Sequence, residues 1–202
     1  VNEDYNYNPS SPYSASKAAA DQLIKSYFRT YGSQVVIANA CNNYGPNQLP
    51  EKFIPKVIFN ILNNKPIPLY GKGRNVREWI YVKDNCEALL KIFLRGKIGK
   101  NYNIGTGIRV KNIELIRNIL NIAKKNKIVL GRRNKIKFVK DRPGHDKRYA
   151  INSTKIKNKI GWKPKVSFEV GLKKTFSWYL KNQQYFSKLN KKDITKRIGV
   201  KK

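Results

Sequence analysis

Short apolar runs that alternate with segments of helical periodicity are the feature that most constrains the fold of this chain. Runs of strand length occur at residues 35–40, 66–70, 78–82, 102–104 and 136–139. Around them, apolar residues recur at the three- and four-residue spacing that places side chains on one helix face. Alternation of strands with helices favours an α/β fold.

Capping residues mark the helices that this pattern predicts. Helices are expected at residues 11–31, 53–62, 84–94, 113–123, 153–160 and 168–180. Ser11 suits an N-cap, Pro12 suits the first turn, and Gly32 suits the end of the first helix. Too few strands precede residue 35 to complete a doubly wound sheet on their own.

Length and composition narrow the class of protein. The 202 residues suit one domain, or one domain with a small lobe. No apolar run approaches the roughly 18–20 residues of a membrane span, and the polar amino terminus does not resemble a signal peptide. Cys41 and Cys86 have no metal-binding spacing, so we expect reduced core thiols and a cytoplasmic location. The absence of methionine leads us to expect a preceding segment.

The charge is strongly positive. The formal net charge is +31, from 43 basic and 12 acidic residues. Such an excess occurs in nucleic-acid-binding proteins, and a basic nucleic-acid-binding module is therefore one alternative. The lysines are dispersed through amphipathic segments, whereas a nucleic-acid footprint requires clustering on one face. We therefore favour dispersed charge on solvated faces, and a positive cleft would also suit a diphosphate ligand.

Tyr13 and Lys17 form the sharpest chemical feature. At positions i and i+4 of a helix they share a face. A nearby ammonium stabilises a phenolate, which can accept a proton from a substrate hydroxyl while a hydride leaves the same carbon. The structural alternative is a surface tyrosine beside a lysine that pairs with Asp21.

The surrounding motifs carry a family resemblance. Residues 11–21 resemble the active-site helix of the extended short-chain dehydrogenases/reductases. Further motifs look like those of dTDP-glucose 4,6-dehydratases in order and spacing, at residues 42–46, 50–55, 70–73, 77–84 and 141–149. The resemblance covers about residues 5–186.

The resemblance implies a role for each matching residue. Tyr13 would be the catalytic base, Lys17 would support it and bind the nicotinamide ribose of NAD, and Asn43 would contact the same cofactor. Substrate contacts are implied for Asn42, Lys52, Phe53, Pro68, Leu69, Tyr70, Arg77, Asn112, Arg142 and His145. Among these, the 68–70 run would line the nucleobase site, and the two arginines would bind the diphosphate, because a guanidinium matches phosphate oxygens.

Several of these residues have a structural alternative. Arg77 could pair with Glu78 or Asp84, the two asparagines of the 42–46 motif could shape a turn, and His145 could be a loop histidine. Within the resemblance we favour ligand contact for the arginines.

The resemblance also implies an architecture and a reaction. Residues 1–50 would belong to an incomplete Rossmann-type sheet, residues 51–187 mainly to a smaller α/β nucleotide-sugar lobe, and residues 188–202 to a basic disordered tail. The helix of Tyr13 would join two copies in a homodimer. The reaction would convert dTDP-glucose into the 4-keto-6-deoxy sugar nucleotide with NAD.

Two expected features of such an enzyme are missing from the sequence. Gly71 to Gly73 lacks a third glycine and a following helix, so no Gly-rich phosphate turn is recognised. The family's Thr/Ser-Asp-Glu acid–base run does not precede Tyr13, where Glu3 and Asp4 stand in a different setting. We therefore expect a carboxy-terminal part of an enzyme that binds NAD poorly and does not turn over alone. The alternatives are a UDP-glucose 4,6-dehydratase, an epimerase or decarboxylase of the same family, or a non-catalytic nucleotide-sugar binder.

Overall fold

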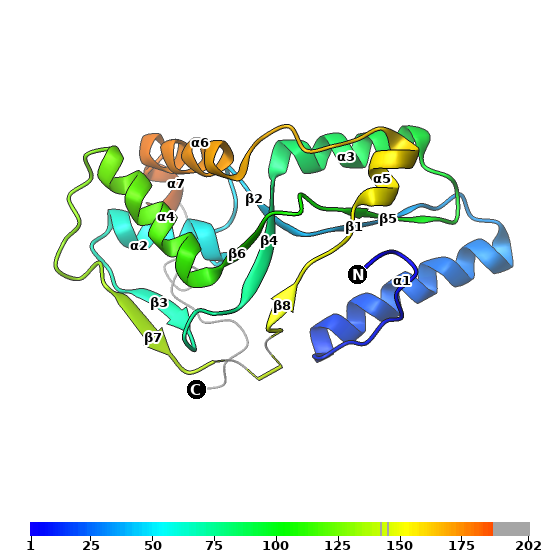
Figure 1. The fold of residues 1–202 in the computed structure, drawn as a ribbon, viewed down its shortest axis with the longest axis horizontal. Helices are drawn as coiled ribbons and strands as arrows, with labels where there is room; N and C mark the ends of the chain where they lie inside the picture. The colour runs from blue at the N-terminus through cyan, green and yellow to red at the C-terminus, as the bar shows by residue number, and fades with distance from the viewer. Residues whose placement is uncertain (142, 145, 188–202) are drawn as a thin grey trace. The chain divides into compact units, whose positions relative to one another are not determined.

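The computed structural model divides the chain into two compact units. It describes residues 1–141, 143–144 and 146–187. The first unit comprises Val1–Asn43, Arg77–Arg109 and Gly144–Lys165, and the second comprises Tyr44–Val76, Val110–Pro143 and residues from 166 onward. Figure 1 labels the elements of both units. The assignment of residues 1–50 and 51–187 to two lobes stays a prediction.

The first unit is built on a pair of parallel strands. Its elements are α1 (Pro12–Tyr31), β1 (Ile37–Ala40), most of β4 (Val76–Tyr81), α3 (Val82–Arg95), β5 (Asn101–Ile104), β8 (Arg148–Tyr149) and α5 (Thr154–Ile160). β1 and β5 run parallel, with Ile37 opposite Asn101. Helices α3 and α5 pack on these strands and on each other (Figure 1). Ile80, Ile104 and Trp162 lie in the core between them.

Helix α1 begins and ends where the sequence predicts. The Ser11 hydroxyl accepts a hydrogen bond from the backbone N–H of Ser14, and Gly32 adopts the left-handed conformation at the other end. Glycine is favoured there because it has no Cβ to clash. None of the helix's residues is buried.

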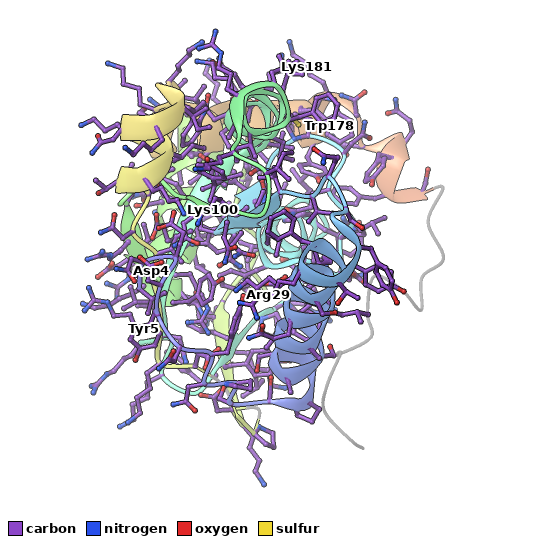
Figure 2. All side chains as sticks on the ribbon, turned by 90° about the vertical axis from the view of Figure 1, so that its right-hand side faces the viewer. Asp4, Tyr5, Arg29, Lys100, Trp178 and Lys181 are labelled. Carbon is purple, nitrogen blue, oxygen red and sulfur yellow. The ribbon has the colours of Figure 1, made fainter. Side chains whose placement is uncertain are left out.

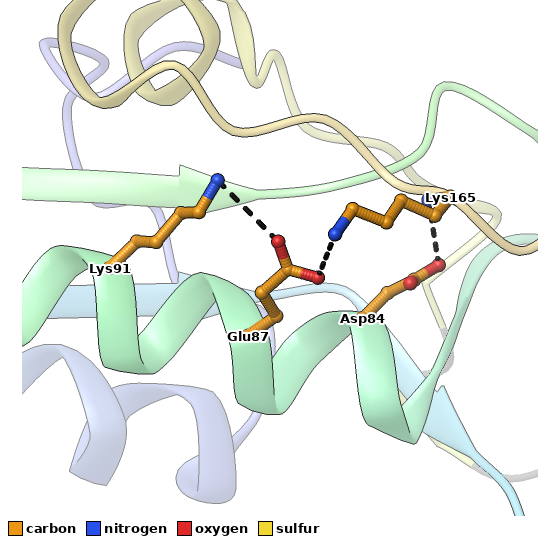
Figure 3. A network of polar contacts seen from close by, with 4 residues as sticks. All are labelled: Asp84, Glu87, Lys91 and Lys165. Atoms are coloured by element: carbon orange, nitrogen blue, oxygen red, sulfur yellow. Dashed lines mark hydrogen bonds and ion pairs between the residues drawn. The ribbon is translucent and has the colours of Figure 1, made fainter.

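Polar contacts hold the segment that contains Lys165 against α3. Asp84 is buried in the first turn of α3, and its Oδ2 accepts the backbone N–H of Lys165 at 3.1 Å. The Lys165 Nζ lies 2.8 Å from Glu87, which also pairs with Lys91 at 3.5 Å (Figure 3). The hydrogen bond from Lys165 holds the pKa of Glu87 below its ordinary value. The sequence predicted that this helix begins at residue 84, but α3 begins at Val82, and the Asp84 carboxylate binds the backbone of Lys165.

The second unit packs helices beside another parallel strand pair. It contains α2 (Phe53–Leu62), β3 (Ile67–Tyr70), α4 (Asn112–Lys125), β7 (Ile136–Val139), α6 (Phe168–Lys181) and α7 (Gln184–Ser187). β3 pairs with β7 in parallel, and α2, α4 and α6 contact one another. Tyr179 stacks on Phe186 with ring centroids 5.1 Å apart, and its hydroxyl donates to the carbonyl of Gln48 at 2.5 Å.

The chain passes from one unit to the other several times. Three of these crossings fall inside strands, namely β2 (Asn42–Tyr44), β4 and β6 (Arg109–Lys111), and the chain also crosses after Pro143 and after Lys165. In sheet order β4 stands between β2 and β6, and β8 also pairs with β4. The sequence did not predict β2, β6, β8 or α7. β6 and β8 are too short to show a periodic pattern, and asparagines disfavour a strand prediction for β2. The predicted α/β class is confirmed.

Basic side chains are distributed over many elements. Figure 2 shows nitrogen-tipped side chains projecting from several helices, strands and loops, with Arg29 of α1, Lys100 and Lys181 of α6 among those labelled. Within the described residues, no helix has the length and apolarity needed to cross a bilayer.

A glycine contact in the first unit yields a stability prediction. Gly99 has φ +74°, and a Cβ there would lie 2.4 Å from the Phe28 ring of α1. Gly107 has φ +76° with open space around it. Gly107→Ala should cost about 1–2 kcal/mol from backbone strain alone. Gly99→Ala should cost about 1–3 kcal/mol more, because the methyl group overlaps the ring. Urea unfolding of both variants measures the difference, and equal losses would contradict the close packing of α1.

Candidate functional site

Tyr13 and Lys17 stand exposed on α1. Tyr13 is the second residue of the helix and 76% exposed, and Lys17 is exposed one turn later. Asp21, the alternative partner of Lys17, accepts a hydrogen bond from the Tyr7 hydroxyl at 2.8 Å. Burial and this carboxylate raise the pKa of Tyr7 to about 12. The helix therefore presents a phenol and an ammonium on one face, with the preceding loop bound to Asp21.

The start of α1 lies against Gly144 and the segment 146–151. The Ser10 hydroxyl donates to Asp146 Oδ1 at 2.7 Å. Gly144 approaches so closely that a Cβ there would lie 2.9 Å from the Ser10 carbonyl oxygen. Tyr149 lies in the electrostatic range of Tyr13, and its pKa is raised mainly by burial, with further contributions from neighbouring groups that include Tyr13.

Arg77 is also attached to this segment. Its Nη2 donates to the carbonyl of Asp146 at 2.8 Å, and only 9% of the residue is exposed. Its neighbour Glu78 is fully buried and accepts backbone N–H groups from Thr106, Gly107 and Ile151. The implied contact of Arg77 with a diphosphate stays a prediction.

The two asparagines of the 42–46 motif lie in β2. Asn42 is exposed, and Asn43 is half-buried with its Nδ2 donating to the Cys41 carbonyl at 3.3 Å. Burial, followed by the charge of Glu78, raises the pKa of Cys41 to about 12. The Cys41 thiol is therefore a core group, as the sequence predicts, whereas Cys86 is exposed, contrary to the sequence expectation.

The remaining described candidates belong to the second unit. Lys52 is exposed and pairs with Glu51 at 2.8 Å, and Phe53 begins α2. In β3, Pro68 and Tyr70 are half-buried, whereas Leu69 is only 1% exposed. The Leu69 side chain thus lies in the core, where it packs so tightly that a Cβ at Gly73 would lie 2.5 Å from it.

Asn112 is the most distinctive residue of this set. It is the first residue of α4 and 9% exposed, and its backbone N–H donates to the Asn75 carbonyl at 3.0 Å. Its side-chain Oδ1 is buried and has no hydrogen-bond partner among the described residues. A buried acceptor without a partner costs free energy unless a ligand or water supplies a donor.

A family comparison matches most of this chain. The family model described as GDP-mannose 4,6 dehydratase matches residues 1–175. The chain belongs to this family.

Curated proteins similar to this chain include dTDP-glucose 4,6-dehydratases. The enzyme of Salmonella typhimurium is 48% identical over 182 residues, which are 89% of this chain and 50% of the relative. A probable dTDP-glucose 4,6-dehydratase of Sinorhizobium fredii is 47% identical over 198 residues, or 96% and 56% of the two chains. The chain spans about half the length of the curated relatives it matches. The resemblance inferred from the motifs is confirmed.

Solved structures of the family have the same fold. A dTDP-glucose 4,6-dehydratase from Streptomyces venezuelae, solved with NAD bound, superposes with a TM-score of 0.86 at 40% identity over 92% of this chain and 56% of that one. The enzyme from Bacillus anthracis, in complex with NAD, gives 0.85 at 41% identity over 93% and 58%. The Rossmann-type class predicted from the sequence is confirmed.

The contacts of Tyr13, Lys17 and Asn43 with NAD stay predictions, which the chemistry of these side chains supports. The phenol of Tyr13, the ammonium of Lys17 and the amide of Asn43 suit the hydroxyl groups of a ribose. The glycine turn at residues 71–73 does not suit the phosphates. A Cβ at Gly71 would lie 3.1 Å from the Asp141 carboxylate, and the turn leads into β4 instead of a helix. In the described residues, no group of three or more His, Cys, Asp or Glu side chains could hold a metal ion.

Two predicted residues and several unpredicted ones complete the comparison with the sequence. Arg142 and His145 lie outside the described residues. Sequence reasoning gave no role to Ser10 and Asp146, which are hydrogen-bonded at the start of α1, or to Tyr149, which has Tyr13 among its electrostatic neighbours. Asp146 and Tyr149 belong to the 141–149 motif, so the motif pointed to the segment but not to its contacts.

Proposed function

We propose that this chain carries the proton-transfer and sugar-nucleotide elements of an NAD-dependent dTDP-glucose 4,6-dehydratase. The observation that carries the proposal is the Tyr13–Lys17 pair on one exposed face of a capped helix. The dehydratase relatives at 47–48% identity support the substrate class. The presence of NAD in two similar structures supports the cofactor.

The chemistry of this chain centres on Tyr13. Its phenolate accepts the proton of the sugar 4-hydroxyl, and Lys17 stabilises the phenolate and binds the ribose beside it. NAD, when bound, would accept the hydride from carbon 4 and return it to carbon 6 after water has left, so the net change is the loss of one water molecule. The ketone formed at carbon 4 acidifies the hydrogen on carbon 5, so water can leave across carbons 5 and 6. No residue of this chain is assigned as the acid or base of that elimination, because no Thr/Ser-Asp-Glu run precedes Tyr13.

The second unit supplies nucleotide contacts in this proposal. Asn112 offers its buried Oδ1 to a ligand donor, and Pro68 and Tyr70 offer half-buried surface to the base. Because Leu69 is in the core, its contact to a base would come from the backbone. In the first unit, Arg77 is proposed to bind the diphosphate. The diphosphate contact of Arg142 and the nucleotide contact of His145 stay predictions for residues outside the described part of the chain.

Helix α1 is also the proposed contact with a second copy. Its apolar residues Leu23, Tyr27 and Tyr31 follow one another at four-residue spacing and are 60%, 50% and 73% exposed. An apolar stripe on a helix normally faces another surface.

A cytoplasmic location is proposed from the free cysteines.

The catalytic proposal is tested by joining this chain to the amino-terminal half of the Salmonella typhimurium relative. The hybrid should convert dTDP-glucose with loss of one water molecule, detected by mass spectrometry. Tyr13→Phe removes the proton acceptor and should lower turnover about 100- to 10,000-fold. Tyr5→Phe, an exposed tyrosine in the amino-terminal loop, is the control. Full activity of the Tyr13→Phe hybrid would contradict the assigned base, and equal turnover of UDP-glucose would contradict the dTDP preference.

The nucleotide contact is tested on the chain itself. Calorimetry should detect dTDP binding and little or no NAD binding, because the contacts proposed for this chain involve only the ribose end of NAD. Asn112→Ala should weaken dTDP binding about 5- to 100-fold, the range expected for a lost buried hydrogen bond. Asn121→Ala on the same helix removes an exposed amide and should have no effect. Unchanged affinity of Asn112→Ala would remove Asn112 from the proposed site.

The second-copy contact predicts a self-associating chain. Tyr27→Lys places a charge in the apolar stripe and should shift sedimentation toward the monomer at micromolar concentration. Gln22→Lys adds the same charge on the opposite side of α1 and should leave the distribution unchanged. Identical distributions for the two variants would contradict the proposed contact.

A further inference from the structure

Glu78 is a carboxylate with no exposed surface in the first unit. Its Oε1 accepts the backbone N–H groups of Thr106 at 2.7 Å and Gly107 at 2.8 Å. Its Oε2 accepts the backbone N–H of Ile151 at 3.1 Å. A buried charge is tolerated only when hydrogen bonds replace its hydration, and bonds to an ionised acceptor are stronger than neutral ones.

The surrounding backbone is shaped to admit this carboxylate. A Cβ at Gly105 would lie 2.4 Å from Glu78 Oε1 and 3.0 Å from Ile151 Cγ1. Any side chain larger than hydrogen at this position would therefore displace the carboxylate. Glu78 thus joins three separate parts of the chain, namely β4, the turn after β5 and the residues after β8.

One of these parts leads directly to the start of the active-site helix. Ile151 ends the segment 146–151, in which Asp146 accepts hydrogen bonds from Ser10 through its side chain and from Arg77 through its carbonyl. Tyr149 lies on the same segment and has Tyr13 among its electrostatic neighbours. The position of this segment therefore influences the environment of the residues at the start of α1.

We propose that Glu78 is a positioning residue, which holds the segment 146–151, with Asp146 and Tyr149, at the start of α1 and thereby sets the electrostatic environment of Tyr13. Its significance for dehydration rests on the proposed function, whereas its effect on the segment does not. The competing explanation is that Glu78 contributes only to the overall stability of the first unit.

Two substitutions disturb the Glu78 carboxylate in different ways. In Glu78→Gln the amide oxygen can still accept from Thr106 and Gly107, but the NH₂ group faces the N–H of Ile151, and two donors repel. Gly105→Ala leaves the carboxylate charged and displaces it with a methyl group. Glu87→Gln is the matched control, because Glu87 is a half-buried carboxylate of α3 that is paired with lysines.

The experiment observes the tyrosine rings and the three amides in the 202-residue chain. The tyrosine rings are labelled with ¹³C, and their signals are assigned through Tyr13→Phe and Tyr149→Phe. At temperatures well below unfolding, both Glu78→Gln and Gly105→Ala should change the chemical shifts of Tyr13 and Tyr149. Glu87→Gln should not. In Glu78→Gln, amide exchange at Ile151 should rise about tenfold or more, while Thr106 and Gly107 change little, as expected for one lost hydrogen bond.

Each outcome decides the proposal. Unmoved tyrosine signals, or an equal rise in exchange at all three amides, would leave Glu78 as a stability residue and overturn the proposal. If one variant does not fold, the other variant still tests the proposal. Rapid amide exchange at Ile151 in the unaltered chain would also overturn the proposal. Calorimetry with dTDP reports on the proposed function separately. An unaltered chain that fails to bind dTDP counts against that function and leaves the tyrosine result valid.

Discussion

The first unit depends on how one buried charge is satisfied. Removing a carboxylate from water costs several kcal/mol, and this cost must be offset locally. Glu78 meets the requirement with three backbone N–H groups that come from two segments distant in sequence. Because backbone groups cannot move independently of their segments, satisfying the charge also fixes where those segments run. The surroundings of Tyr13 follow from that constraint, through the contacts of Ser10 and Arg77 with Asp146.

The chemistry is divided between the units in a physically sensible way. The first unit holds the group that can move a proton, Tyr13, with Lys17 on the same helix face. The second holds Asn112, a buried acceptor whose hydrogen-bonding capacity is unused within the described residues. An unsatisfied acceptor costs stability in the free protein, and a ligand donor would recover that cost on binding. Such a site favours a ligand with polar edges, which suits a nucleotide.

Local signals predicted the elements that are long and capped. Helix α1 follows from Ser11, Pro12 and Gly32, because capping depends on residues adjacent in sequence. Asp84 shows where local reasoning stops. A carboxylate near a helix start predicts a cap, yet this one accepts the N–H of Lys165, a partner 81 residues away. Leu69 is similar, since its motif implied a base contact while packing buried its side chain.

The sequence alone determined the α/β class, the main helices, the family and the Tyr13–Lys17 pair, because periodicity, caps and motif spacing are properties of neighbouring residues. Only the tertiary structure decided what surrounds that pair. It attached Asp146 to Ser10 at the start of α1, buried Glu78 and left the Asn112 oxygen without a partner among the described residues. These outcomes depend on contacts between segments many residues apart, which no local pattern records.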